Sequence, residues 1–159
     1  MRISPVPYDH PDAVKLTELV QQEYAERYGG EGDLTPLDPA MFRPPNGLFL
    51  VAYDERNRPV ATGGWRAMDE NEENYRDGDA ELKRMFVVPE VRGQGLARRI
   101  LAVLEDDARA ANRTRMVLET GTAQPEAMAL YESSGYVPAE KFGVYRFHDS
   151  SRCYAKPLR

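Results

Sequence analysis

The stretch from Ala80 to Ala111 constrains the fold of this chain more than any other. It begins with a run rich in Val, Phe and Met that ends at Pro89, and this content predicts a β-strand. From Leu96 onward, apolar residues recur at helical spacing and predict an amphipathic helix. Between them lies a turn that contains Gly93 and Gly95. A strand, a glycine turn and a helix in this order predict a site where backbone N–H groups point outward at an anion.

This glycine turn has the features of a phosphate-binding site. Glycine lacks Cβ and accepts positive φ, so that a ligand can come close to the backbone. The first turn of a helix has N–H groups without a partner in the helix, and its dipole adds about half a positive charge there. Three arginines, Arg92, Arg98 and Arg99, surround the turn. The sequence therefore predicts that the turn binds phosphate.

Length and composition exclude several classes of protein. A chain of 159 residues predicts one domain over residues 1–159. A net charge of −5 without a long basic run argues against nucleic acid as a partner. No apolar run has the length of a transmembrane helix, and the N-terminus lacks the apolar core of a signal peptide, so no membrane partner is expected. The single cysteine, Cys153, fits a reducing compartment, and we expect a cytoplasmic protein.

The other elements are predicted from periodicity and from helix-breaking residues. A helix should begin near Pro11 and end at Gly29-Gly30. Residues 31–46 are rich in Pro and Gly and predict a loop with one helical turn near residues 39–42. The glycines of the Gly63-Gly64 pair predict a bulge or a close approach within a strand. The expected strands are 2–7, 47–53, 60–68, 80–88, 114–120 and 152–157, and the later helices are 96–111 and 125–133. Because a helix connects them, strands 80–88 and 114–120 should be parallel neighbours.

Two motifs about 35 residues apart make the chain resemble the GNAT superfamily of acetyl-CoA-dependent N-acetyltransferases. The first, Arg92-Gly93-Gln94-Gly95-Leu96-Ala97, matches the pyrophosphate loop R/Q-x-x-G-x-G/A of that family. It follows Met85-Phe86-Val87-Val88-Pro89-Glu90, which is also typical. The second, Ala127-Met128-Ala129-Leu130-Tyr131 with Gly135-Tyr136, matches A-x-x-L-Y followed by a glycine–aromatic pair. The order of the expected elements agrees with the family over nearly the whole chain.

The resemblance implies an α/β (α+β) GNAT fold. Its sheet is central and mixed, mostly antiparallel, with about six or seven strands, a splayed parallel pair and helices on both faces. The implied activity moves an acetyl group from acetyl-CoA, as cosubstrate and without a metal, directly to a primary amine of a small molecule or peptide. The alternative is a non-catalytic acyl-CoA sensor on the same fold. Family precedent also implies a homodimer, whereas the identity of the amine acceptor stays open.

The resemblance also assigns coenzyme contacts. The backbone from Arg92 to Arg98 should hold the pyrophosphate, and the strand segment Met85–Val87 should pair with the pantetheine arm. Gln124 occupies a position where many members have an asparagine that binds this arm, and here Pro125 follows it. The implied coenzyme-binding residues are Met85, Phe86, Val87, Arg92, Gly93, Gln94, Gly95, Leu96, Ala97, Arg98 and Gln124.

Two residues are candidates for the chemistry. Tyr131 is the candidate general acid, since a phenol with a pKa near 10 is protonated at neutral pH and can donate to a leaving thiolate. Its alternative role is that of a core tyrosine. Glu81 is the candidate base that takes a proton from the attacking amine, and its alternative is a strand glutamate in a salt bridge. Glu119 and Thr120 could also line the cleft. The acidic loop from Asp69 to Asp79 either attracts a cationic acceptor or is a solvated surface loop.

Overall fold

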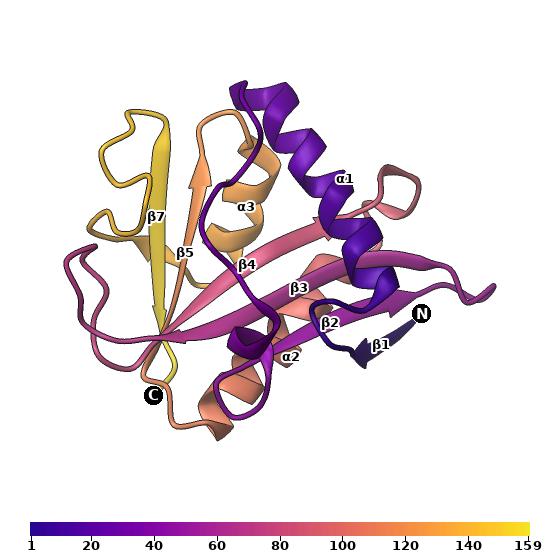
Figure 1. Cartoon of the computed structure of the whole chain (residues 1–159), viewed down its shortest axis with the longest axis horizontal. Coiled ribbons are helices and arrows are strands. Elements are labelled where there is room, and N and C mark those ends of the chain that lie inside the picture. Colours follow the sequence, from indigo (N-terminus) through magenta and orange to yellow (C-terminus); the bar gives the residue numbers. More distant parts are fainter.

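The computed structural model describes all 159 residues as one seven-stranded sheet with three α-helices (Figure 1). The strands are β1 (Arg2–Pro5), β2 (Gly47–Tyr53), β3 (Pro59–Met68), β4 (Asp79–Val87), β5 (Arg115–Gly121), β6 (Val137–Pro138) and β7 (Ser151–Pro157). The helices are α1 (Pro11–Tyr28), α2 (Leu96–Ala110) and α3 (Pro125–Ser133), with short 3-10 turns at Pro39–Phe42 and Pro89–Val91. The expected order of elements is confirmed, and strand β1 ends two residues earlier than expected.

The sheet has the order β1-β2-β3-β4-β5-β7-β6, and all neighbouring strands are antiparallel except β4 and β5. These two strands pair in parallel only where Asp79, Ala80 and Glu81 face Arg115, Met116 and Val117. We call these three pairs the seam. Beyond the seam the strands diverge as a V, which Figure 1 shows as they leave a common point at the lower left. The expected mixed sheet with a splayed parallel pair is therefore confirmed.

Buried ion pairs hold the seam together. Asp79 is fully buried, and both of its carboxylate oxygens accept from the guanidinium of Arg115, at 2.8 and 2.9 Å. Arg113 donates to the backbone oxygen of Asp79 as well, at 3.0 and 3.2 Å. A carboxylate that is buried in this way needs such a bidentate partner to offset its lost hydration. Strands β4 and β5 are therefore tied together by these contacts at the seam, where the V begins.

A bulge in β4 turns the strand at the open part of the V. Thr62 of β3 pairs with Phe86 of β4, and Gly64 pairs with Lys83. Two residues of β4, Arg84 and Met85, therefore lie opposite the single residue Gly63. Arg84 has a φ of 60°, which is unusual for a residue with a side chain. A Cβ on Gly63 would collide with the side chains of Met85 and Ile100, so any larger residue there would have to displace them. The bulge and the close approach predicted from Gly63-Gly64 are both present.

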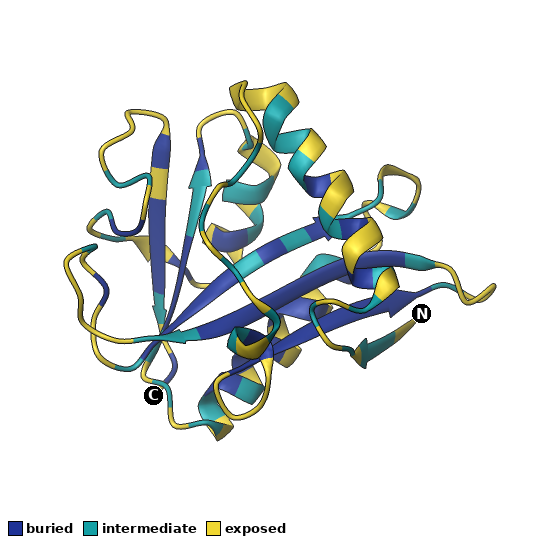
Figure 2. Cartoon of the chain, in the orientation of Figure 1, coloured by how far each residue is buried: buried dark blue, intermediate teal, exposed yellow.

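Helices cover both faces of the sheet, as expected. Helices α2 and α3 pack on one face around the buried side chains Trp65, Ile100 and Leu104. Helix α1 packs on the other face, where Leu16 and Val20 contact the core formed by β2. Figure 2 shows the central strands β2, β3 and β4 buried along most of their length, whereas the edge strand β1 and many loops are more exposed. No helix has both the length and the apolar character to cross a membrane.

Candidate active site

Two cavities meet in the open part of the V. The larger, of about 770 Å³, lies between α1, the end of β4, the glycine turn and α3, and we call it the glycine-turn cavity. The smaller, of about 290 Å³, lies between β4, β5 and the loops that follow α1 and precede β7, and we call it the Glu119 cavity. The two share one wall, formed by Tyr24, Met85, Gln124, Ala127 and Tyr131. A molecule that filled both cavities would pass these five residues.

The glycine turn presents six consecutive backbone N–H groups, from Gly93 to Arg98, that have no partner in the protein. The next N–H, of Arg99, already bonds to the carbonyl of Gly95 as the first bond of α2. Gly93 and Gly95 have φ of 83° and 77°, the left-handed region in which glycine is favoured. Free N–H groups at a helix N-terminus attract an anion through both hydrogen bonds and the helix dipole. The unpaired N–H groups predicted from the sequence are therefore present, and their binding of phosphate stays a prediction.

The arginines of the turn lie on its two sides. The guanidinium of Arg92 donates to the backbone oxygen of Val87 at 2.8 Å and forms an ion pair of 3.0 Å with Glu23 of α1. The guanidinium of Arg98 instead donates to the hydroxyls of Ser133 and Ser134 at the end of α3, at 2.9 and 3.0 Å. The two side chains thus place positive charge on opposite rims of the same cavity.

The residues predicted to contact a coenzyme gather around the glycine-turn cavity. Beyond the seam, β4 has no partner strand on its β5 side, so its backbone there can pair with a ligand. Gln124 lies in the shared wall and accepts a hydrogen bond from Tyr28 at 3.1 Å. The cavity is lined by Met85, Phe86, Val87, Arg92, Gly93, Gly95, Leu96, Ala97, Arg98 and Gln124, with Gln94 beside them in the turn. Their role in coenzyme binding stays a prediction.

Tyr131 lies in the shared wall, where a group leaving one cavity for the other must pass. Its ring packs edge-on against Tyr136, with centroids 5.9 Å apart. Burial raises the pKa of Tyr131 above its usual value, so that the phenol is protonated at neutral pH. The Tyr131 hydroxyl has no hydrogen-bond partner in the protein, while that of Tyr136 donates to Glu105 at 2.7 Å. Tyr131 therefore has a free proton to donate into the cleft.

Glu81, the candidate base, lies in the seam and does not line either cavity. Its carboxylate is buried, and both of its oxygens are engaged. Nε of Arg66 donates to Oε1 at 2.8 Å, Nη2 of Arg66 forms an ion pair with the same oxygen at 2.8 Å, and Tyr75 donates to Oε2 at 2.9 Å. Because both oxygens are engaged in this way and the residue lines neither cavity, Glu81 is poorly placed to meet an amine that binds there. This arrangement corresponds to the alternative role, that of a strand glutamate in a salt bridge.

Glu119 on β5 lines the cleft instead and gives the smaller cavity its name. It accepts one hydrogen bond, from the hydroxyl of Ser151 at 2.7 Å. Burial raises the pKa of Glu119 to about 7, because the charged form loses hydration that Ser151 replaces only in part. A carboxylate that titrates near neutral pH suits a general base. Sequence reasoning placed Glu119 beside the cleft without a role. The available signal was its position at the carboxyl end of a parallel strand, where ligands of open α/β sheets bind.

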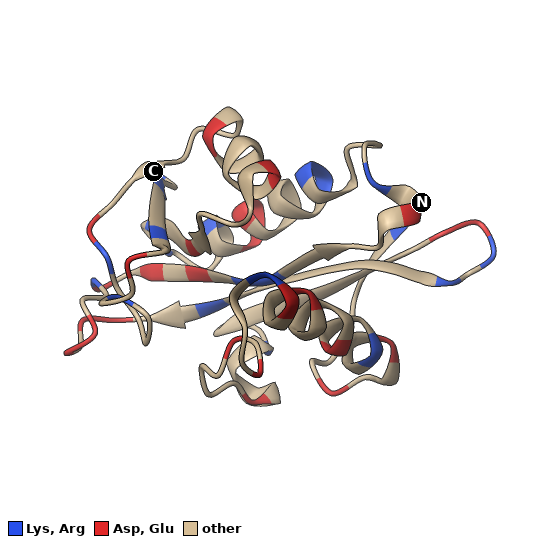
Figure 3. Cartoon of the chain, turned by 90° about the horizontal axis from the view of Figure 1, so that it is seen from above, with Lys and Arg blue, Asp and Glu red and all other residues tan.

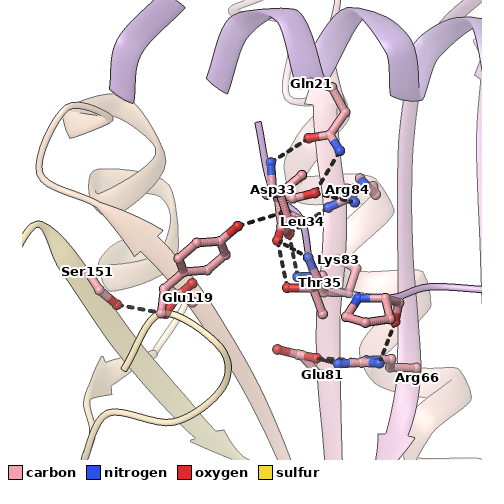
Figure 4. Close-up of polar contacts among 12 residues, drawn as sticks. Gln21, Asp33, Leu34, Thr35, Arg66, Glu81, Lys83, Arg84, Glu119 and Ser151 are labelled. Carbon is pink, nitrogen blue, oxygen red and sulfur yellow. Dashed lines mark hydrogen bonds and ion pairs between the residues drawn. The ribbon is translucent and has the colours of Figure 1, made fainter. Parts of the chain in front are cut away.

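An unpredicted ionic cluster closes the same cavity from the α1 side (Figure 4). Oδ2 of Asp33 accepts from Lys83 and from Arg84, each at 2.7 Å, and its Oδ1 accepts from the backbone and hydroxyl of Thr35. Burial alone would raise the pKa of Asp33, but the two cations hold it well below its usual range. Gln21 of α1 bonds to the backbone of Asp33 in both directions, at 2.8 Å. The loop that was predicted only as irregular is thereby fixed over the cleft.

The acidic loop between β3 and β4 lies at the seam end of the sheet, seen at the left in Figure 3. Its charge is partly neutralised by ion pairs of Asp69 with Arg113 at 3.0 Å and of Glu73 with Arg146 at 3.7 Å. Asp79 at its end is bound to Arg115. This placement favours a structural loop over a device that attracts a cationic acceptor.

The structure thus has a splayed parallel pair, unpaired N–H groups at a helix N-terminus on its open side, and a tyrosine between two joined cavities, as the resemblance implied. The chain belongs to the Acetyltransferase (GNAT) family, whose model matches residues 13–136. The resemblance that the two motifs indicated is thus confirmed.

The chain is also similar to individual proteins that are named as acetyltransferases or acyltransferases. The chain is 36% identical over 145 residues to the "IAA acetyltransferase" of Azospirillum brasilense, with 91% of this chain and 90% of that protein covered. A Klebsiella pneumoniae structure assigned to the acyl-CoA N-acyltransferases superposes with a TM-score of 0.78 at 28% identity, over 99% of this chain and 97% of the other. An aminoglycoside 6'-N-acetyltransferase in complex with coenzyme A has the same fold, with a TM-score of 0.69 at 16% identity and 100% and 98% coverage.

Proposed function

We propose that this protein transfers the acetyl group of acetyl-CoA directly to the primary amine of a small molecule or peptide. The observation that carries the proposal is the continuity of the site. Six free N–H groups of the glycine turn, the unpaired edge of β4 and the hydroxyl of Tyr131 follow one another along two joined cavities. The fold neighbour that was solved with coenzyme A supports this choice of acetyl donor.

The coenzyme would occupy the glycine-turn cavity. Its pyrophosphate would accept hydrogen bonds from the turn, with Arg92 and Arg98 on either side. Its pantetheine arm would run along the unpaired edge of Met85–Val87 as an added strand, which is a form of β-augmentation. This path brings the thioester to the shared wall, next to Tyr131 and to the entrance of the Glu119 cavity.

The amine would enter from the Glu119 cavity, and Glu119 replaces Glu81 as the proposed base. The carboxylate takes a proton from the ammonium form, after which the amine attacks the thioester carbon. The new C–N bond forms, and backbone N–H groups of the splayed β4 edge stabilise the charge on the carbonyl oxygen. When the C–S bond breaks, Tyr131 donates its proton to the leaving sulfur. The nitrogen, which still carries one proton more than the amide, gives that proton to the Tyr131 phenolate, and Glu119 releases its own proton to solvent. No covalent enzyme intermediate is needed, and proximity supplies much of the rate.

The donor assignment can be tested at Gly95. Gly95→Trp is expected to weaken binding of acetyl-CoA at least about tenfold, because an L-residue at positive φ costs about 1–2 kcal/mol and the indole would occupy the anion site. Isothermal titration calorimetry measures the change. Gly30→Trp is the matched control, since Gly30 has a similar φ of 75°, equally open surroundings and no part in either cavity. Unchanged affinity in Gly95→Trp would remove the turn from coenzyme binding.

Release of free thiol from acetyl-CoA tests the activity itself. The acceptor panel should contain amino acids, polyamines, aminoglycosides and lysine-containing peptides. Amine-dependent thiol release with a matching mass increase of the acceptor is expected. Tight binding of acetyl-CoA without release by any amine would instead indicate an acyl-CoA sensor. A cytoplasmic location and a homodimer remain expectations of the sequence.

A further inference from the structure

We propose that the acceptor carries a carboxylate beside its primary amine, as an α-amino acid does, and that Lys83 and Arg84 bind this carboxylate. The inference rests on the proposed function and names the class of acceptor for the same site. Among the ion pairs that line the Glu119 cavity, two cations share one carboxylate.

Two cations of this cavity share a single carboxylate oxygen. Lys83 and Arg84 both donate to Oδ2 of Asp33, and no other carboxylate forms an ion pair with either of them. Their side chains are 10% and 4% exposed, and that of Asp33 is 15% exposed. Two largely buried cations therefore share one carboxylate in their ion pairs, and Glu119, the other acid of the cavity lining, forms no ion pair with either of them. Because charges in such a site are poorly hydrated, a ligand anion in contact with these two cations is favoured.

Unpartnered polar atoms in the same cavity also indicate a polar ligand. Nε of Arg84 and Oγ1 of Thr120 are buried and have no hydrogen-bond partner, although both residues line the Glu119 cavity. The ammonium of Lys83 has three donor hydrogens and makes one hydrogen bond, to Asp33. Buried polar groups of a folded protein are nearly always satisfied, so unpartnered ones in a cavity mark where a ligand binds. A carboxylate accepts hydrogen bonds on both oxygens and matches the surplus of donors.

Glu119 lies in the same cavity as Lys83, so the amine and the carboxylate of one acceptor can bind at the two residues together. The charge of Lys83 acts on the Glu119 carboxyl, which places the cation and the base within electrostatic reach of each other in one cavity of about 290 Å³. In an α-amino acid the carboxylate and the amine are bonded to one carbon. The carboxylate can therefore contact Lys83 while the amine faces Glu119 and the shared wall. A polyamine would bring two or more positive charges next to Lys83 and Arg84, and repulsion would reject it.

The decisive experiment uses the unmodified protein and matched acceptors. Thiol release is measured with amino acids and with the amines that lack only the carboxylate, such as phenylalanine against phenethylamine, serine against ethanolamine and lysine against cadaverine. The amino acid of the best pair is expected to have a kcat/KM at least about tenfold higher, as one charge-assisted hydrogen bond contributes about 1.5–3 kcal/mol. Equal values, or spermidine as the best acceptor, would overturn the inference. Thiol release with none of the amines would defeat the proposed function itself.

Variants of Lys83 locate the carboxylate. Lys83→Met is expected to bring the ratio of kcat/KM between the amino acid and its decarboxylated partner close to one, and Lys83→Arg should retain most of it. Lys15→Met, at an exposed position on α1, is the control for a general change of charge. Circular dichroism establishes whether each variant is folded. If Lys83→Met does not fold, the ratio of kcat/KM is compared between Lys83→Arg and the wild type instead. A full ratio in folded Lys83→Met would show that the carboxylate binds elsewhere.

Discussion

Replacing Tyr131 by phenylalanine is expected to lower kcat at least about 100-fold while the Kd of acetyl-CoA changes less than about threefold. The substitution removes one hydroxyl from the shared wall and keeps the ring that packs against Tyr136. Without the phenol, the sulfur would have to leave as an unprotonated thiolate. Steady-state thiol release gives kcat, and calorimetry gives the affinity for the coenzyme.

Two further tyrosines provide the comparison. The hydroxyl of Tyr136 is bonded to Glu105 and lies outside both cavities, so Tyr136→Phe should cost stability and leave kcat within about threefold. Tyr24 lies in the shared wall, and burial raises its pKa to about 12, so it is the nearest rival for the acid role. A larger loss of kcat in Tyr24→Phe than in Tyr131→Phe would transfer that role to Tyr24.

Glu119→Gln is expected to lower kcat/KM by about 100-fold or more and to abolish its rise with pH near 7. Because burial raises the pKa of Glu119 to about 7, the free enzyme should gain activity as this group loses its proton. Glutamine fills the same space and can still accept from Ser151, so the loss reports the missing base. Glu18→Gln, at an exposed position on α1, is the matched control. If the rise near pH 7 persists in Glu119→Gln, another group is the base.

The pH dependence of stability tests the raised pKa of Glu119 without any measurement of activity. In the unfolded chain Glu119 has a pKa of 4.5 and in the folded protein one of about 7. As the pH rises from 4.5 to 7 the unfolded chain loses this proton first, so the group lowers the free energy of unfolding over that range. Glu119→Gln removes the penalty. Its Tm relative to the wild type should therefore be higher at pH 7.5 than at pH 5, and a constant difference would contradict the raised pKa.

Much of the fold could be predicted because its signals are local. Proline at the start of α1, the glycines that end it and the strand–turn–helix sequence around Gly95 act on their immediate neighbours, and these elements appear where expected. The point at which β4 and β5 separate could not be predicted in this way. It depends on ion pairs between residues far apart in the chain, Asp79 with Arg115 and Glu81 with Arg66, and on a bulge that only Gly63-Gly64 indicated.

The same distinction applies to the site. The glycine turn is contiguous in sequence, so its residues could be named in advance. The choice between Glu81 and Glu119 depends on which carboxylate is bound by a buried cation and which faces a cavity. In the sequence, both simply stand next to a leucine on a predicted strand. Asp33 belongs to a Pro- and Gly-rich segment without periodicity. Its importance comes from Lys83 and Arg84, some fifty positions later, which only the folded chain brings together.

The short seam has a mechanical consequence. Three residue pairs join a plate formed by β1 to β4 to a plate formed by β5 to β7, and elsewhere the two plates have no ladder in common. A pantetheine arm bound along the unpaired edge of β4 would form additional contacts between the two plates. Breathing motions that part the plates should then be suppressed by acetyl-CoA, with slower amide exchange at the end of β4 and little change within β2. A bound coenzyme would in this respect complete the sheet along its open edge.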